Sequence, residues 1–143
     1  MKKILILNGP NLNLLGKREP DKYGSATLAD VEAMCAHAAT ELGFEVDCKQ
    51  SNHEGELIDA VQKAGAEKMP VVFNPGAFSH TSVALRDAIS GSDAEIYEVH
   101  ITNIHARERF RHHSHVSPVA KGVIAGFGVN GYLLAIQAIA ENK

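Results

Sequence analysis

Polar side chains gather where several apolar runs of the chain end, and some are of types that do acid–base or anion-binding chemistry. The relevant residues are Asn8, Asn11, Asn13, Asn74, Ser79, His80, Thr81, His100, Thr102 and Asn103. Asn, Ser and Thr make turns and cap helices everywhere, so these residues have a plain structural explanation. Neither role favours histidine, which makes His80 and His100 the better candidates for function.

The loop after the first apolar run holds an arginine and a tyrosine, Arg18 and Tyr23, between two candidate hinge glycines, Gly16 and Gly24. A free tyrosine is almost fully protonated at neutral pH. A guanidinium beside the phenol favours the phenolate, which is a general base. The alternative is an exposed loop tyrosine and a solvated arginine. In the functional interpretation the loop is a lid that carries the base.

Residues 100–115 contain three arginines and five of the eight histidines. As a metal site this segment lacks the HExxH pattern and has no Cys or Asp spaced with its histidines. As an anion site it is well supplied, because arginine binds carboxylates through paired donors. A solvated basic surface is the remaining alternative.

Three other kinds of catalytic site are disfavoured. The stretch from Gly126 to Gly131 matches GxGxxG, but too little chain follows it for the second strand and ribose-binding acid of a dinucleotide site, so we expect these glycines to allow close helix packing. No lysine directly follows the first, third or fourth apolar run, which argues against imine chemistry. The GxSxG elbow is absent. The remaining candidate groups are suited to proton abstraction and elimination on a small carboxylate, without a cofactor or a metal.

Apolar periodicity predicts the elements that must position these residues. The predicted strands are residues 4–7, 44–48, 69–74, 95–99 and 122–125. The predicted helices run from a Thr27 cap to Gly43, from near Asn52 to Gly65, from Thr81 or Ser82 through Ile89, and from Tyr132 to Ala140. This alternation predicts a flavodoxin-like, doubly wound five-stranded parallel sheet, order 2-1-3-4-5, in a three-layer α/β/α arrangement. Ligands of such sheets bind between strands one and three. We expect one catalytic domain over residues 1–143, with a lid at about 16–25.

The composition fits this interpretation and disfavours others. The chain has 143 residues and a formal charge of -3, so nucleic acid is a poor first guess as a partner. Cys35 and Cys48 have neither disulfide-framework nor zinc spacing and are expected to be buried thiols in a reducing, cytoplasmic environment. The N-terminal apolar run is too short for a signal peptide. Residues 122–140 carry no charge, yet their glycines favour a strand, a turn and a helix over a membrane span.

Four blocks of sequence, in order, resemble the type II 3-dehydroquinate dehydratases over nearly the whole chain. The first is NGPNLNLLG at 8–16 with REP at 18–20 and YG at 23–24. The second is NPGAFSHTS at 74–82 with ALRD at 84–87. The third is EVH at 98–100 with Asn103 and HARE at 105–108. The fourth is FRHHS at 110–114 with GVI at 122–124 and GY at 131–132.

The resemblance implies a cofactor-free hydro-lyase of the shikimate pathway of aromatic amino acid biosynthesis. It implies that Tyr23 removes a proton beside the ketone of 3-dehydroquinate, that Arg18 favours the phenolate, that a water near Asn11 stabilises the enolate, and that His100 protonates the departing hydroxyl in an anti elimination. The substrate-binding positions that it implies are Asn74, His80, Asp87, Ile101, Thr102 and Arg111. Asp87 would reach the site of a neighbouring subunit in a homododecamer built as a tetramer of trimers.

Two positions depart from the family pattern. Thr102 and His115 stand where Ser and Tyr are more usual. Threonine keeps the hydroxyl, so carboxylate binding should survive, whereas His115 affects only local packing or a subunit contact. The rival hypothesis is a non-catalytic flavodoxin-like module that binds a phosphate or a nucleotide, which the absence of a P-loop disfavours.

Overall fold

The computed structural model describes residues 2–142 and builds them around one parallel sheet. Its strands are β1 Lys2–Asn8, β2 Phe44–Gln50, β3 Val71–Asn74, β4 Ile96–His100 and β5 Gly122–Ala125, and they lie in the order β2-β1-β3-β4-β5. Its helices are α1 Pro20–Tyr23, α2 Leu28–Glu41, α3 Glu54–Glu67, α4 Val83–Ser92 and α5 Asn130–Glu141. The predicted strand order and flavodoxin-like class are confirmed.

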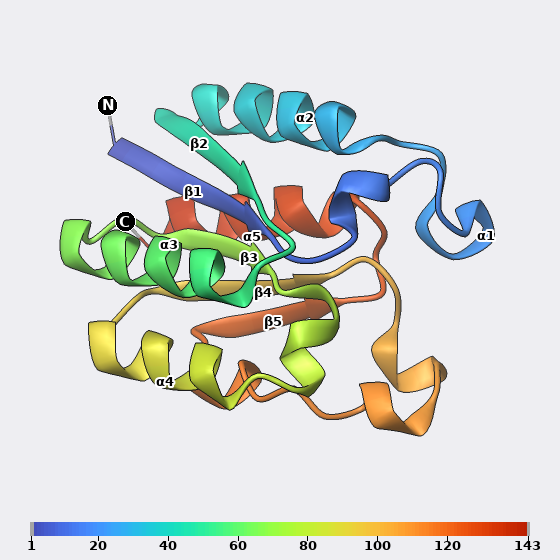
Figure 1. The fold of residues 1–143 in the computed structure, drawn as a ribbon. Helices are drawn as coiled ribbons and strands as arrows, with labels where there is room; N and C mark the ends of the chain where they lie inside the picture. Colours follow the sequence, from blue (N-terminus) through green and yellow to red (C-terminus); the bar gives the residue numbers. More distant parts are fainter. Residues whose placement is uncertain (1, 143) are drawn as a thin grey trace.

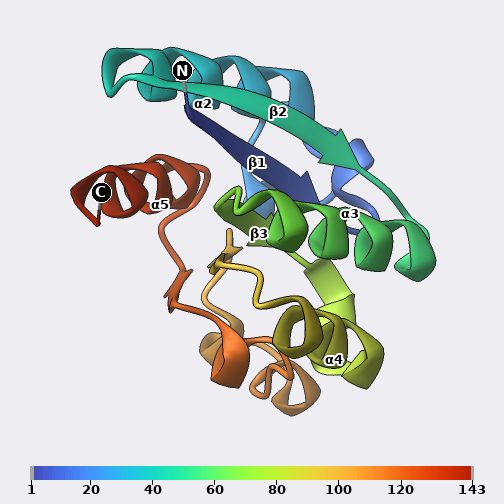
Figure 2. The same cartoon turned by 90° about the vertical axis from the view of Figure 1, so that its left-hand side faces the viewer.

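Two layers of helix cover the sheet because its central strands are apolar on both faces. Ile4 and Ile6 of β1 pack with α2 and α5, and Leu5 and Leu7 pack with α3 and α4. Burying such a side chain fully stabilises the fold by about 1.5–3 kcal/mol. Because β1 is covered on both faces, every one of its central positions can be apolar, which explains the continuous apolar run. Figures 1 and 2 show the twisted sheet between these layers, and Figure 1 shows α1 beyond the carboxyl ends of the strands.

Several helix ends follow the predicted chemistry. Thr27 caps α2 in a capping box with Asp30, Gly43 follows α2 with a φ of 86°, and Ser82 accepts the Leu85 N–H at the start of α4. The prediction that Gly65 ends α3 is wrong, because the helix continues to Glu67. A Cβ at position 65 would lie 2.5 Å from the Ser92 carbonyl oxygen, so this glycine permits the close approach of α3 and α4.

Other predictions needed smaller corrections. Residues 69 and 70 precede β3 rather than belong to it, and α5 begins at Asn130, two positions before the predicted start. Cys35 is buried as expected, but Cys48 is exposed, because it lies on the edge strand β2. Within residues 2–142 we find no helix of the length and apolarity that crossing a bilayer requires.

Candidate active site

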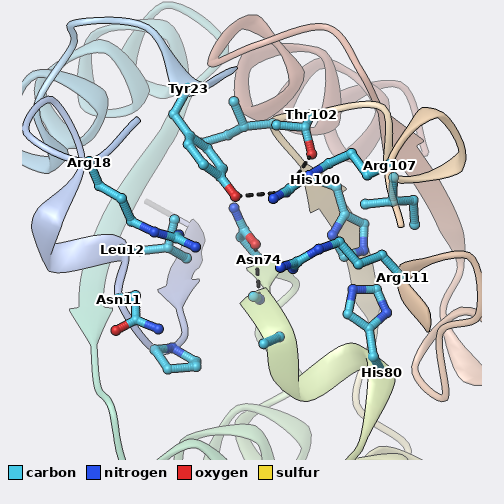
Figure 3. A pocket seen from close by; sticks show the side chains of 15 residues that line it. Asn11, Leu12, Arg18, Tyr23, Asn74, His80, His100, Thr102, Arg107 and Arg111 are labelled. Carbon is cyan, nitrogen blue, oxygen red and sulfur yellow. Dashed lines mark hydrogen bonds between the residues drawn. The ribbon is translucent and has the colours of Figure 1, made fainter. Parts of the chain in front are cut away.

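A pocket lies at the carboxyl ends of β1, β3 and β4, where parallel strand ends converge (Figure 3). It surrounds about 490 Å³ of space, part of it open to solvent. The predicted position is between strands one and three, and the pocket also extends over the end of β4. The predicted site residues that line it are Asn11, Arg18, Tyr23, Asn74, His80, His100, Ile101, Thr102 and Arg111. Asp87 is exposed on α4 and does not line this pocket.

Tyr23 ends the short helix α1 and meets two guanidinium groups. Its hydroxyl oxygen accepts a hydrogen bond of 2.7 Å from Nη1 of Arg107, and Cζ of Arg18 lies 4.8 Å from the centre of its ring. The cation predicted at this phenol is Arg18 alone, and the sequence predicts no individual role for Arg107. The donor to the oxygen is Arg107 (Figure 3), while Arg18 covers the ring face. A charged donor on the oxygen stabilises the phenolate directly.

A buried carboxylate holds the ring of His100. Oε2 of Glu98 lies 2.5 Å from Nε2 of His100, and the Glu98 side chain is fully buried. The hydroxyls of Ser114 and Ser117 donate to the same carboxylate at 2.8 Å and 2.6 Å. Burial alone would raise the pKa of Glu98, but the hydrogen bonds from His100, Ser117 and Ser114 and the charge of His100 outweigh it, so this pKa is lowered. Glu98 therefore stays ionised and leaves Nδ1 of His100 for a ligand.

Glu98→Gln should weaken the fold in a pH-dependent way. Because the pKa of Glu98 lies below its ordinary value of 4.5 in the folded state, its stabilising effect is present above that pH and is lost as pH falls through the lowered pKa. We expect the variant to be less stable than the parent by about 1–3 kcal/mol at pH 7, with the difference shrinking below pH about 4. Urea unfolding of the parent and the variant, at pH 7 and below pH about 4, measures the difference in stability. An equal difference at each pH would contradict the assignment.

His80 presents a hydrogen-bond acceptor to the pocket. Its Nδ1 lies 2.8 Å from the carbonyl oxygen of His113, and because a carbonyl only accepts, Nδ1 carries the hydrogen. Burial lowers the pKa of His80, and the charges of His100 and Arg111 act in the same direction, outweighing the hydrogen bond to His113. The ring is therefore neutral at neutral pH, with Nε2 free to accept from a hydroxyl group.

The backbone after β4 is held by the turn that contains GxGxxG. The N–H groups of Gly126 and Gly128, both at positive φ, donate to the carbonyls of His100 and Ile101 at 3.2 Å and 3.0 Å. Only Gly131 shows the predicted close helix packing, since a Cβ there would lie 3.3 Å from Val99. The first two glycines instead orient the peptide units at the pocket edge.

Two arginines of the predicted anion cluster also reach the pocket. Nη1 of Arg107 donates to Oγ1 of Thr102 at 3.3 Å, and Nε of Arg111 donates to Glu108 at 2.9 Å, which holds Arg111 beside the opening. Four of the five histidines of this segment contact one another in pairs, His105 with His112 and His113 with His115. Among residues 2–142 we find no group of three or more His, Cys, Asp or Glu side chains arranged to hold a metal ion.

Gly9 brings two pocket loops together, and a side chain there should separate them. A Cβ at position 9 would lie 2.5 Å from the carbonyl oxygen of Pro75 and 2.8 Å from its carbon, both of them backbone atoms. We expect Gly9→Ala to lower the free energy of unfolding by about 1–3 kcal/mol. The control is Gly55→Ala in α3, where nothing lies within 4 Å and the helix should gain up to about 1 kcal/mol. Urea unfolding compares them, and equal stability of the two variants would refute the argument.

This arrangement, a tyrosine beside two arginines and a histidine held by a buried carboxylate, is typical of α/β enzymes that perform acid–base chemistry on a small anion. Comparisons with known proteins narrow the class. The family model described as "Dehydroquinase class II" matches residues 2–140. The chain is 60% identical to a 3-dehydroquinate dehydratase of Marinomonas sp. (strain MWYL1), over 99% of this chain and 97% of that one. It is 59% identical to one of Variovorax paradoxus (strain S110), over 97% and 99%.

A solved structure agrees with these relatives. The type II dehydroquinase from Propionibacterium acnes superposes with a TM-score of 0.96 at 45% identity, covering 99% of this chain and 97% of that chain. The chain therefore belongs to the class II dehydroquinase family.

Proposed function

We propose that this protein removes water from 3-dehydroquinate to give 3-dehydroshikimate, as a hydro-lyase without a cofactor. The observation that carries the proposal is the convergence of two acid–base groups on one pocket. One is the phenol of Tyr23 with Arg107 on its oxygen, and the other is the imidazole of His100 with Glu98 behind it. Family membership supports the same reaction. The non-catalytic binding module has no comparable support.

The first step is the removal of a proton by Tyr23. The phenolate takes the proton from the carbon beside the ketone, the electron pair of that C–H bond forms a carbon–carbon double bond, and the π pair of the ketone moves to its oxygen, giving an enolate. The guanidinium of Arg107, 2.7 Å from the phenol oxygen, stabilises the phenolate before the transfer. Arg18 adds positive charge over the ring.

Asn11 is the residue proposed to stabilise the enolate. It has a left-handed backbone with φ of 69°, and its N–H donates at 3.0 Å to Oδ1 of Asn52 in the loop after β2, so a contact between two loops holds this conformation. Its side chain lines the same pocket as Tyr23. A water bound by this amide donates to the enolate oxygen where negative charge develops.

The second step is the loss of the hydroxyl group. The enolate electrons form the new carbon–carbon double bond as the carbon–oxygen bond breaks, and His100 gives its proton to the leaving oxygen, which departs as water. Because Nε2 of His100 is held by Glu98, the proton comes from Nδ1. The Glu98 carboxylate stabilises the imidazolium that must exist before this transfer.

The substrate carboxylate and hydroxyls are assigned to groups around the end of β4. We place the carboxylate against the N–H groups of Ile101 and Thr102, whose peptide units are oriented by the turn at Gly126 and Gly128. No hydrogen bond among the described residues uses either N–H as donor. The hydroxyl of Thr102 donates as well, and Asn74, His80 and Arg111 bind the remaining oxygen atoms.

The proposal also covers the setting of the site. The whole chain acts as one catalytic domain in the cytoplasm, in the shikimate pathway of aromatic amino acid biosynthesis. Residues 16–25 act as a lid, supported by the positive φ of Gly16 and Gly24 at its ends. The active assembly is a homododecamer, a tetramer of trimers. In that assembly Asp87, exposed on α4, contributes to the pocket of a neighbouring subunit.

The direct test is to mix the purified protein with 3-dehydroquinate and follow the ultraviolet absorbance of the conjugated enone product. We expect turnover that is unchanged by a metal chelator, and no adduct when borohydride is added with substrate. Absence of product would refute the proposal. Loss of activity with chelator would refute the metal-free mechanism, and a borohydride-trapped lysine would refute the enolate route.

A further inference from the structure

A fully buried chain of hydrogen bonds connects helix α5 to the floor of the pocket. Nδ2 of Asn74 donates to the hydroxyl of Tyr132 at 3.0 Å, and that hydroxyl donates to Oδ1 of Asn8 at 2.5 Å. The side chains come from three elements, because Asn74 ends β3, Asn8 ends β1 and Tyr132 lies in the first turn of α5. Asn8 and Asn74 are paired in the sheet register, so the tyrosine hydroxyl joins two adjacent strand ends.

The donors in this chain determine how the Asn74 amide must lie. The N–H of Gly76 meets the other side of that amide at 3.1 Å, and because an N–H only donates, the atom it meets is Oδ1. Nδ2 therefore faces Tyr132 and uses one of its two hydrogens there. Rotating the amide by 180° would oppose two donors at Gly76. The second hydrogen of Nδ2 is not used by any hydrogen bond among the described residues, and Asn74 lines the pocket.

The chain of hydrogen bonds is poorly explained by stability alone. Tyr132 and Asn8 have no exposed surface, and Nδ2 of Asn8 is buried without a hydrogen-bond partner among the described residues. An unpaired buried donor is a cost that apolar side chains of the same shape would avoid. Asn8 and Tyr132 do not line the pocket themselves, so their contact with it is through Asn74. Buried polar groups retained at a cost beside a site are expected to serve the site.

We propose that Tyr132 is a positioning residue, whose hydroxyl, held by Asn8, fixes the side-chain amide of Asn74 so that a donor faces the substrate. The inference rests on the proposed function, because it takes Asn74 as a substrate-binding residue. Removing the hydroxyl leaves only Gly76 to hold the amide, which then swings away by breaking one hydrogen bond instead of two. Substrate affinity should fall, whereas the reacting groups Tyr23 and His100 should keep their own contacts.

The test is Tyr132→Phe, which keeps the buried ring and removes only the hydroxyl. We expect KM for 3-dehydroquinate to rise about tenfold, with kcat within about twofold of the parent. The matched control is Tyr97→Phe. Tyr97 belongs to the same hydrophobic cluster, and its hydroxyl is hydrogen-bonded to Glu95 and Asn142 rather than to the site. Removing the Tyr97 hydroxyl should change neither KM nor kcat. An unchanged KM in Tyr132→Phe would overturn the inference.

A double-mutant cycle separates positioning from general loosening of the fold. In an Asn74→Ala background, Tyr132→Phe has no amide to position and should raise KM no further. An equal rise in both backgrounds would overturn the inference and leave a structural role. If Tyr132→Phe does not fold, Asn8→Leu makes the same comparison, because it removes the acceptor that orients the tyrosine hydroxyl. If the parent protein dehydrates 3-dehydroquinate but Asn74→Ala leaves KM unchanged, Asn74 does not bind substrate. That result would overturn the positioning role of Tyr132 while leaving the proposed reaction intact.

Discussion

Tyr23→Phe should lower kcat by about 10² to 10⁴, the usual contribution of a general base. The substitution removes only the oxygen that accepts from Arg107 at 2.7 Å, and the ring under Arg18 remains. No other ionisable oxygen of the lid lines the pocket, since Glu19 and Asp21 are not among its walls. Steady-state kinetics on 3-dehydroquinate measure the effect. Turnover at the parental rate would refute the mechanism at its first step.

Two comparisons show whether the lost rate is chemistry. Product binding to Tyr23→Phe, followed by calorimetry, should stay close to that of the parent, because the phenol acts on a proton and not on the carboxylate. Arg107→Met should lower kcat more than Arg18→Met, because Arg107 donates to the phenol oxygen whereas Arg18 lies over the ring face. The reverse order would assign the activating cation to Arg18, as sequence reasoning had it.

The fold was predictable because its signals are local and strong. A continuous apolar run such as residues 4–7 must be covered on both faces, and five alternations of strand and helix leave few sheet orders. The end of α3 was not predictable in the same way. Glycine is a common helix terminator, and only the proximity of Ser92 in the folded chain reveals that Gly65 serves packing instead.

The location of the site was also predictable, because residues after parallel strands converge at one edge. The pairing of side chains within it was not. Arg107 reaches Tyr23 across 84 positions of sequence, and no spacing rule connects two loops at that separation. Glu98 left a usable signal: it is an acid within an apolar strand, two residues before His100, so both side chains lie on one face. A buried acid beside a histidine is a candidate pair.

The pair formed by Glu98 and His100 carries the second large prediction. His100→Gln should lower kcat by about 10² to 10⁴, because glutamine fills similar space but has no acidic proton for the leaving hydroxyl. Glu98→Gln should lower kcat less, since the imidazole remains but loses its anionic partner at 2.5 Å. Steady-state kinetics with both variants test this order.

Proton exchange in His100→Gln and Tyr23→Phe also distinguishes an acid from a binding residue. If His100 donates the proton, proton abstraction by Tyr23 survives in His100→Gln, and exchange of the substrate proton with deuterated solvent should continue while water loss stops. NMR of 3-dehydroquinate incubated in D₂O with each variant reads this exchange directly. Tyr23→Phe, lacking the base, should show neither exchange nor elimination. Exchange abolished in His100→Gln would place His100 in the first step and contradict the division of labour between the two groups.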